Sequence, residues 1–164
     1  MLASAFVREG KSVASFPMYG FERRGAPVVA FTRVDDKPIR EKTQIYNPDC
    51  LVVIDPGLLA LPTLFTGLKP DSVFVLNSPR KLAAKPNDNL KIGAVVNATQ
   101  IAVDEIGRDI PNTCLIAAVA AATGWLKLES ILDSLPDYLS GDILERNLKS
   151  AERGYREVEV TKWS

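Results

Sequence analysis

The sequence predicts a single α/β domain with three layers, a largely parallel sheet and a helical C-terminal third. Three short apolar runs, "CLVVIDP", "SVFVLNS" and "KIGAVVNAT", alternate with segments of helix or loop composition, and this alternation is typical of parallel strands joined by crossovers. The last third of the chain holds helical segments instead. A chain of 164 residues that is 46% hydrophobic can bury its own core, so we expect one domain over residues 1–164.

Composition limits the chemistry that this chain can perform. It has 20 Lys and Arg against 20 Asp and Glu, no histidine, and two cysteines, Cys50 and Cys114, that each lie inside an apolar run. The balanced charge predicts no nucleic-acid or membrane partner, and two scattered thiols cannot hold an iron-sulfur cluster, which needs about four. We therefore expect no metal or cofactor on this chain alone, no complete active site, and a reducing, cytoplasmic location.

The first 40 residues predict the end of a helix followed by two strands. In "MLASAFVREG", Leu2, Phe6 and Gly10 have the spacing of a helix face and a glycine stop, whereas the start of this segment has no capping residue. The runs "KSVASF" and "APVVAFTRV" are rich in valine and phenylalanine, and "VDDKPI" has the composition of a turn. We expect strands over these two runs.

Polar residues end the three apolar runs that follow. Asp55, Asn77 and Asn97 each come directly after one of the predicted strands, and the carboxyl ends of parallel strands are where such sheets meet ligands or partners. Short polar residues in these positions also cap the next helix or turn routinely. Both interpretations stay open from the sequence.

The C-terminal third predicts packing helices. Thr99 can cap "QIAVDEI", which ends at Gly107, and Asn112 can cap the apolar segment "TCLIAAVAAAT", which ends at Gly124. A helix that is apolar all round must be covered on all sides, and its apolar run is far shorter than the roughly 20 residues of a membrane span. We therefore expect a core or subunit-contact position for Leu115, Ile116, Val119 and Ala120.

The last 25 residues predict one more helix and an edge strand. Asp142 and Glu145 form a pair that resembles a capping box at the start of "ILERNLKSAER", and Gly154 follows as the expected stop. In the tail "YREVEVTKWS", Val158 and Val160 alternate with charged residues. This tail predicts a short edge strand or an arm that contacts a neighbour.

Two segments are candidate contact sites. In "FPMYGFERRGAPVVAFTRV", Gly20 and Gly25 permit a sharp bend, and the adjacent Arg23 and Arg24 cannot point the same way in an extended chain. We expect one arginine to pair within the domain and the other to reach a carboxylate or phosphate, although a solvated turn has the same composition. The ligand-binding or subunit-contact candidates are Tyr19, Gly20, Glu22, Arg23, Arg24, Gly25 and Pro27.

The second candidate is the start of the apolar helix. Asn112 and Thr113 in "PNTCLIAAVAAATG" are expected to place unpaired amides and a partial positive charge near a partner-facing edge. An ordinary capped core helix is the alternative.

Three strings give the chain a family resemblance. The segment "FPMYGFERRGAPVVAFTRVDDKPIREKTQIYNPDCLVVIDPGLL" closely resembles the gamma subunit, or gamma domain, of the pyruvate and 2-ketoisovalerate ferredoxin oxidoreductases, and "IPNTCLIAAVAAATG" and "NLKSAERGY" are similar to the same family. The resemblance covers nearly the whole chain. Its "ERRGAP" form is more similar to the pyruvate and branched-chain members than to the 2-oxoglutarate members.

The resemblance implies a subunit without catalytic residues of its own. Enzymes of this family convert a 2-oxoacid and coenzyme A to acyl-CoA and carbon dioxide and reduce ferredoxin. Their alpha and beta parts hold thiamine diphosphate with magnesium, and their beta and delta parts hold iron-sulfur clusters. The gamma part is implied to have a Rossmann-like sheet, to pack on the alpha and beta subunits and to help cover the coenzyme A site. "SGDILERN" lacks the glycine-aspartate-glycine start of the thiamine diphosphate motif.

The front of the chain departs from the family pattern. Family members begin with a strand and a glycine-rich loop before the helix that "MLASAFVREG" completes, so we expect an N-terminally truncated domain in which a missing interior strand exposes ladder edges.

Two other functions stay open: a free-standing nucleotide-binding module, although the sequence contains no G-x-G-x-x-G or Walker A string, and a purely structural interaction protein. Co-eluting partners would distinguish the three.

Overall fold

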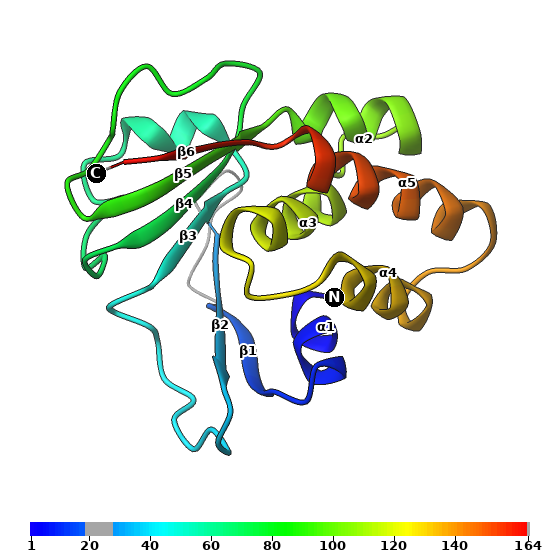
Figure 1. The fold of residues 1–164 in the computed structure, drawn as a ribbon, viewed down its shortest axis with the longest axis horizontal. Helices are drawn as coiled ribbons and strands as arrows, with labels where there is room; N and C mark the ends of the chain where they lie inside the picture. Colours follow the sequence, from blue (N-terminus) through cyan, green and yellow to red (C-terminus); the bar gives the residue numbers. More distant parts are fainter. Residues whose placement is uncertain (19–27, 164) are drawn as a thin grey trace.

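A computed structural model gives the fold of residues 1–18 and 28–163, which are the residues described below. Along the chain these residues form α1 (Leu2–Arg8), β1 (Ser12–Met18), β2 (Val29–Asp35), β3 (Cys50–Val53), the 3₁₀ helix η1 (Pro56–Ala60), β4 (Ser72–Asn77), β5 (Leu90–Val96), α2 (Ala98–Ile106), α3 (Asn112–Thr123), α4 (Leu128–Ser134), the 3₁₀ helix η2 (Leu135–Asp137), α5 (Gly141–Glu157) and β6 (Glu159–Lys162) (Figure 1).

The main sheet has four strands in the order β3-β4-β5-β6. β3, β4 and β5 run parallel, and β6 pairs antiparallel with β5. The prediction of a largely parallel sheet built from the three apolar runs is therefore confirmed, as is an edge strand from the C-terminal tail. The central strand β4 has all its residues buried, as expected for a strand covered on both faces.

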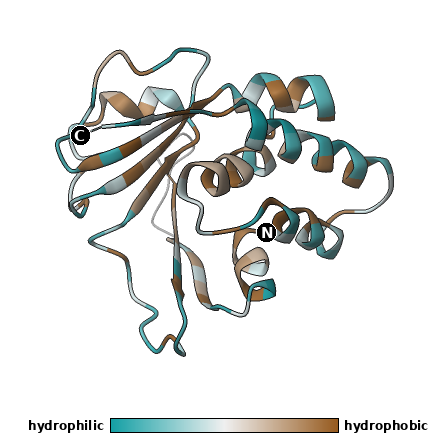
Figure 2. Ribbon diagram, viewed as in Figure 1, coloured by the Kyte–Doolittle hydropathy of each residue, from teal (hydrophilic) through white to brown (hydrophobic). Residues whose placement is uncertain are grey.

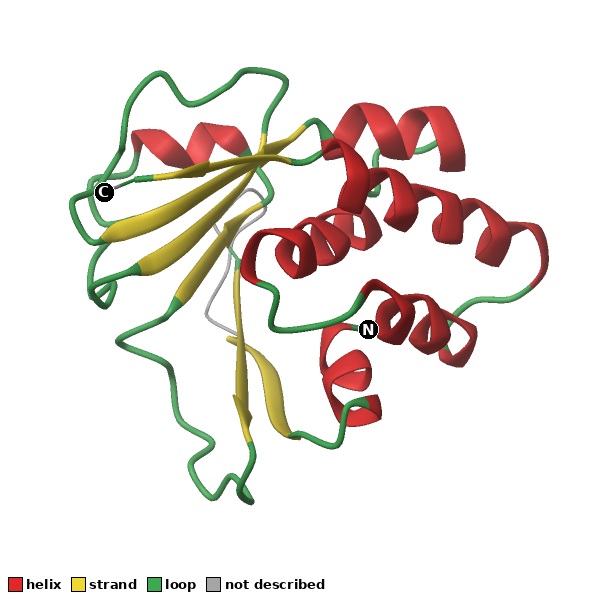
Figure 3. Cartoon of the chain, in the orientation of Figure 1, coloured by secondary structure: helices red, strands yellow, loops and turns green. Residues whose placement is uncertain are grey.

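Two layers cover this sheet on its opposite faces (Figure 3). On one face, Val73 and Val75 of β4 pack with residues of α2 and α3. On the other face, Phe74 and Leu76 pack against the segment that contains η1, through partly buried residues such as Leu58 and Phe65. The alternation of β4 side chains between two apolar layers gives the predicted three-layer α/β architecture.

The helix boundaries correct three details of the sequence prediction. The cap of α2 is Asn97, and Thr99 lies inside the helix. Pro111 occupies the cap position of α3, so Asn112 is its first residue and not its cap. Ser140 precedes α5 without a side-chain cap bond, and Asp142 lies in the first turn, where it pairs with Arg146. The predicted helix ends at Gly107 and Gly124 are correct, since both glycines have a left-handed conformation.

Gly154 is also not a helix stop, because α5 continues past it to Glu157. A Cβ atom at this glycine would collide with the backbone carbonyl oxygen of Cys114 and come within 2.7 Å of the Cys114 Sγ atom. At Gly154, therefore, α5 lies so close to α3 that there is no room for a side chain. The predicted burial of α3 is confirmed: Leu115, Val119 and Ala120 are buried, and Ile116 is half-buried.

The two N-terminal strands form a separate antiparallel hairpin. α1 ends before Gly10, as predicted, and packs with α4 and with the hairpin, where Phe6 shares a cluster with partly buried Val13 and Val34. Figure 1 shows the hairpin extending from α1 beside the main sheet. Within the hairpin, the rings of Phe16 and Phe31 lie 5.7 Å apart.

Candidate functional site

The polar residues at the strand ends make local hydrogen bonds. An Asp55 carboxylate oxygen accepts from the Gly57 N–H at 2.8 Å and caps η1, and the Asn97 side chain accepts from the Gln100 N–H at 3.4 Å and caps α2. Asn77 is buried; its Nδ2 donates to the Ile54 carbonyl at 2.9 Å, and its Oδ1 accepts from the Thr99 N–H at 3.1 Å. These three residues therefore act as caps and as ties between strand ends, the ordinary alternative left open by the sequence.

Beyond the ends of β4 and β5 lies a hollow of about 260 Å³. Basic, acidic and amide side chains share its wall, and its polar and charged lining includes Arg80, Lys81, Gln100, Arg153, Glu157 and Glu159. Lys81 already pairs with Glu159 at 2.8 Å. The hollow therefore carries mixed charge, with three basic side chains against two acidic ones.

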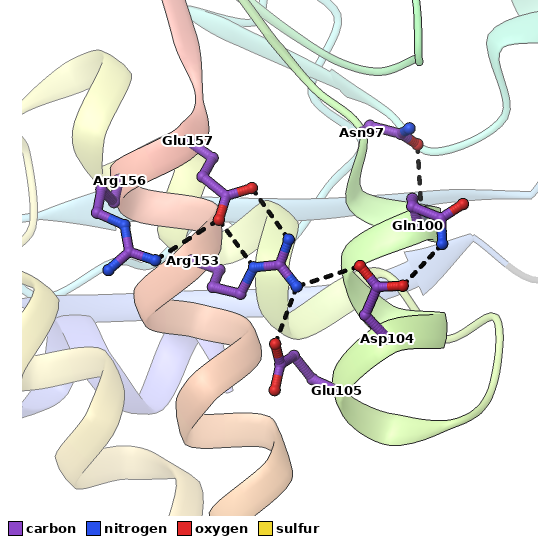
Figure 4. A network of polar contacts seen from close by, with 7 residues as sticks. All are labelled: Asn97, Gln100, Asp104, Glu105, Arg153, Arg156 and Glu157. Atoms are coloured by element: carbon purple, nitrogen blue, oxygen red, sulfur yellow. Dashed lines mark hydrogen bonds and ion pairs between the residues drawn. The ribbon is translucent and has the colours of Figure 1, made fainter.

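Arg153 of α5 is the centre of a network that ties α5 to α2 (Figure 4). Its Nη1 atom lies 3.2 Å from an Asp104 oxygen and 2.9 Å from a Glu105 oxygen, and its Nε lies 2.8 Å from a Glu157 oxygen. Sequence reasoning missed this network because its members come from two helices; the one local signal is the i,i+4 spacing of Arg153 and Glu157.

These ion pairs hold the groups of the network in their charged forms. The hydrogen bonds to Glu157 and Glu105 raise the pKa of Arg153, and the bond from Arg153 lowers the pKa of Glu157. The bond from the Gln100 amide, followed by that from Arg153, lowers the pKa of Asp104. A carboxylate stabilised as an anion is a poor general acid, and the ion pairs of the network join α2 to α5.

The second predicted site consists of Asn112 and Thr113, and the structure places their two side chains differently. Asn112 is exposed at the first position of α3. Thr113 is 1% exposed, and its hydroxyl donates to the Asn147 Oδ1 at 2.8 Å. Asn147 in turn donates to the Ile143 carbonyl at 2.8 Å. Thr113 thus links α3 to α5, whereas Asn112 is free to face a partner.

We expect Thr113→Val to lower the free energy of unfolding by roughly 1–2 kcal/mol, because it leaves a buried amide oxygen of Asn147 without its donor. Urea denaturation measures the change. In a background that already carries Asn147→Ala, the same substitution should cost little, since the partner is gone. Equal costs in both backgrounds would contradict the assignment.

The first predicted site, Tyr19 to Pro27, lies outside the described residues. The strand ends on either side of it are described: Met18 and Val29 are paired across the hairpin, so the segment with Arg23 and Arg24 joins two adjacent strand ends. Met18, Val28 and Val29 are exposed by 40%, 68% and 42%. An apolar, uncovered hairpin end is typical of a surface that a partner covers.

The sulfur atoms offer no reactive group. Burial raises the pKa of the Cys50 thiol to about 12 and that of Cys114 to about 12, so both stay protonated, and a protonated thiol is neither a nucleophile nor a metal ligand. Among the described residues no group of three or more Cys, Asp or Glu side chains could hold a metal ion. Nor is any helix of the described part both long and apolar enough to cross a membrane.

Comparison with known proteins identifies a family and a fold. The family model described as pyruvate ferredoxin/flavodoxin oxidoreductase matches residues 1–157. The pyruvate/ketoisovalerate oxidoreductases common subunit gamma of Pyrococcus furiosus is 46% identical over 98% of this chain and 88% of its own length. The pyruvate synthase subunit PorC of Methanothermobacter thermautotrophicus is 42% identical over 97% of this chain and 86% of its own.

A further relative and a solved structure extend the comparison. The gamma subunit of the NADH-dependent phenylglyoxylate dehydrogenase of Aromatoleum evansii is 42% identical over 98% of this chain and 85% of its own. The crystal structure of the pyruvate oxidoreductase subunit PORC of Thermotoga maritima superposes with a TM-score of 0.85, at 35% identity, over 98% of this chain and 88% of that one.

Proposed function

This chain belongs to the pyruvate ferredoxin/flavodoxin oxidoreductase family, and from that premise we propose the part that it plays in the enzyme. It is the gamma subunit of a multi-subunit 2-oxoacid:ferredoxin oxidoreductase. The observation that carries this assignment is the 46% identity with a gamma subunit over 98% of the chain. Pyruvate is the proposed substrate, because relatives named as pyruvate synthase subunits match at 42% identity over nearly the whole chain.

In the proposed reaction the complex converts a 2-oxoacid, coenzyme A and oxidised ferredoxin to acyl-CoA, carbon dioxide and reduced ferredoxin. The residues of this chain do not fit the cofactors of that chemistry, since it has no histidine and both thiols are held protonated by burial. We therefore assign thiamine diphosphate, magnesium and the iron-sulfur clusters to the alpha, beta and delta subunits. The gamma chain contributes a folded surface to the assembly.

The proposed contact is the segment from Tyr19 to Pro27, which carries Arg23 and Arg24. It joins the paired ends of β1 and β2, beside exposed apolar residues. Coenzyme A brings phosphate groups and partner subunits bring carboxylates, and arginine binds both through two parallel hydrogen bonds. The segment therefore suits a contact with a partner subunit or with the coenzyme A that such a subunit holds, and Asn112 is a second candidate for the same role.

Purification of the chain with its native partners tests the assignment directly. The expected partners are subunits that carry thiamine diphosphate and iron-sulfur clusters, with pyruvate-dependent and coenzyme A-dependent ferredoxin reduction by the whole complex. Co-elution with a nucleotide alone would instead favour a free-standing nucleotide-binding module. A chain that elutes with neither would be a structural interaction protein.

Single substitutions test the arginine segment. We expect Arg23→Ala or Arg24→Ala to weaken complex assembly or to raise the Michaelis constant for coenzyme A. The expected loss of binding free energy is about 1.5–3 kcal/mol, the range for a hydrogen bond to a charged group. One of the two should have this effect, because adjacent residues of an extended chain point in different directions. The other should chiefly affect the stability of the free chain.

Arg108→Ala is the matched control, since Arg108 is an exposed arginine that follows α2. It should leave both measurements unchanged, and thiamine loading of the partners should be the same in all variants. If both segment variants assemble and use coenzyme A like the parent, the segment is an ordinary turn.

A further inference from the structure

The strand β6 is held less firmly than the helix that precedes it. α5 is fixed to α2 by the ion pairs of Arg153 and to α3 by the close contact at Gly154. All the residues of β6 are exposed, and its ion pair joins the side chains of Glu159 and Lys81, which are 55% and 79% exposed. Such an ion pair contributes little stability. The change from firm to weak attachment therefore falls at Val158, between α5 and β6.

One aromatic side chain fastens β6 to the sheet. The indole ring of Trp163, the residue after β6, lies over Gly93 of β5, where a Cβ atom would come within 2.7 Å of the ring atom Cζ3. The Trp163 N–H also donates to the Lys91 carbonyl at 2.8 Å, and its ring packs in the apolar cluster on the η1 face of the sheet. Gly93 thus forms a slot in which Trp163 is seated.

β6 covers an edge of β5 that has no protection of its own. β5 pairs with β4 on one side and with β6 on the other (Figure 1). Residues 92–96 of β5 are uncharged, and β5 is largely brown in Figure 2. An uncharged strand without a neighbour pairs readily with another chain. Glu159 and Trp163, at the two ends of β6, also line two separate hollows of about 260 and 400 Å³, so a displaced β6 would open both.

We propose that β6 is a strap that opens and closes over the edge of β5, hinged at Val158 and locked by Trp163 in the slot at Gly93. The closed strap keeps the β5 edge from pairing with other chains, and the open strap exposes that edge. Opening breaks one short ladder and one aromatic contact, so it costs less free energy than unfolding of the domain. The strap belongs to this chain alone and does not depend on the proposed function.

The backbone of β5 makes the strap measurable, because its hydrogen-bonding groups alternate in direction. The Lys91 carbonyl accepts from Trp163, beside β6, whereas the Val96 carbonyl accepts from the Ser78 N–H at 3.0 Å, on the β4 side. The odd-numbered residues of β5 therefore face β6 and the even-numbered residues face β4. Opening of the strap exposes only the odd-numbered amides, whereas unfolding exposes both sets.

Hydrogen exchange of the parent chain is the first test. After correction for intrinsic rates, we expect the amides of Gly93 and Val95 to exchange at least tenfold faster than those of Ala94 and Val96. Low concentrations of urea should change the exchange of the first pair little, because local opening exposes little surface.

Two tryptophan variants test the lock. We expect Trp163→Ala to speed the exchange of Gly93 and Val95 at least tenfold further and that of Ala94 and Val96 less than twofold. Trp125→Ala is the matched control, since Trp125 is 47% exposed in the connection between α3 and α4, and it should change neither pair. If Trp163→Ala does not fold, the exchange of the parent decides.

Equal exchange of the two pairs of amides in the parent would overturn the proposal, because β6 would then separate from β5 only when the whole domain unfolds. Equal acceleration of both pairs by Trp163→Ala would also overturn it, since the indole ring would then stabilise the sheet as a whole and not lock a strap.

Discussion

Replacement of Gly154 by alanine is expected to lower the free energy of unfolding by about 3 kcal/mol, the upper end of the usual cost of overpacking. In an unobstructed helix interior the same change stabilises by about 1 kcal/mol, because alanine has the higher helix propensity. The sign of the effect is therefore diagnostic. The new methyl group would meet the Cys114 carbonyl oxygen and lie 2.7 Å from its Sγ, so α3 and α5 would have to separate along their contact. Urea denaturation of the variant and the parent measures the cost.

A second glycine provides the control for this prediction. A Cβ atom at Gly93 would meet the indole ring of Trp163, which is a side chain at the C-terminal end and can be removed. Trp163→Ala should therefore reverse the steric part of the cost of Gly93→Ala. Cys114→Ala should reverse only part of the cost of Gly154→Ala, because the carbonyl oxygen remains. A Gly154→Ala chain as stable as the parent would show that the helices adjust freely.

Gly154 also shows why sequence patterns located the helices better than their ends. A glycine after an amphipathic run is a common helix end. Here the helix continues past Gly154 to Glu157, and the glycine instead allows the close contact with Cys114 of α3. Thr99 and Asn97 are both good cap residues, and the choice between them depends on Asn77, whose side chain accepts the Thr99 N–H at 3.1 Å. Both answers depend on a strand or a helix that is distant in the sequence, so a local pattern could not supply them.

The strands were more predictable because their signals are local. Each apolar run between turn residues became a strand, and the parallel order followed from the crossover segments between them. The separation of β1 and β2 into their own hairpin was not predicted, since the composition of a strand does not show which sheet the strand will join.

The candidate sites were predictable only where chemistry is carried by neighbouring residues. Arg23 and Arg24 are adjacent, so the sequence alone marks them, and their role stays a prediction. Arg153 became visible only once α2 and α5 were placed side by side. Thr113 has the sequence signal of a helix start but is buried against Asn147, because the face on which a first-turn residue lies depends on how the helix packs.

Replacement of Phe74 by alanine is expected to have the largest effect, a loss of about 3–5 kcal/mol in the free energy of unfolding. Phe74 is fully buried in the central strand, and its ring meets that of Phe65 at 5.3 Å in an edge-to-face contact. It belongs to the apolar cluster that holds the η1 segment on the sheet. The cavity left by the ring would loosen that layer first, because the segment packs on the sheet through this apolar cluster, whereas the hydrogen bonds from Asn47 and Asn89 hold its end at Gly67 and Leu68.

Val75→Ala is the matched control for Phe74→Ala, because Val75 is equally buried on the next position of β4 but faces α2 and α3. Its smaller volume predicts a smaller cost, and its direction predicts that the η1 layer stays docked. Limited proteolysis under native conditions should therefore cut between residues 56 and 68 in the Phe74 variant and not in the Val75 variant. Equal cleavage in both would mean that the η1 segment is held by the stability of the whole domain and not by the ring of Phe74.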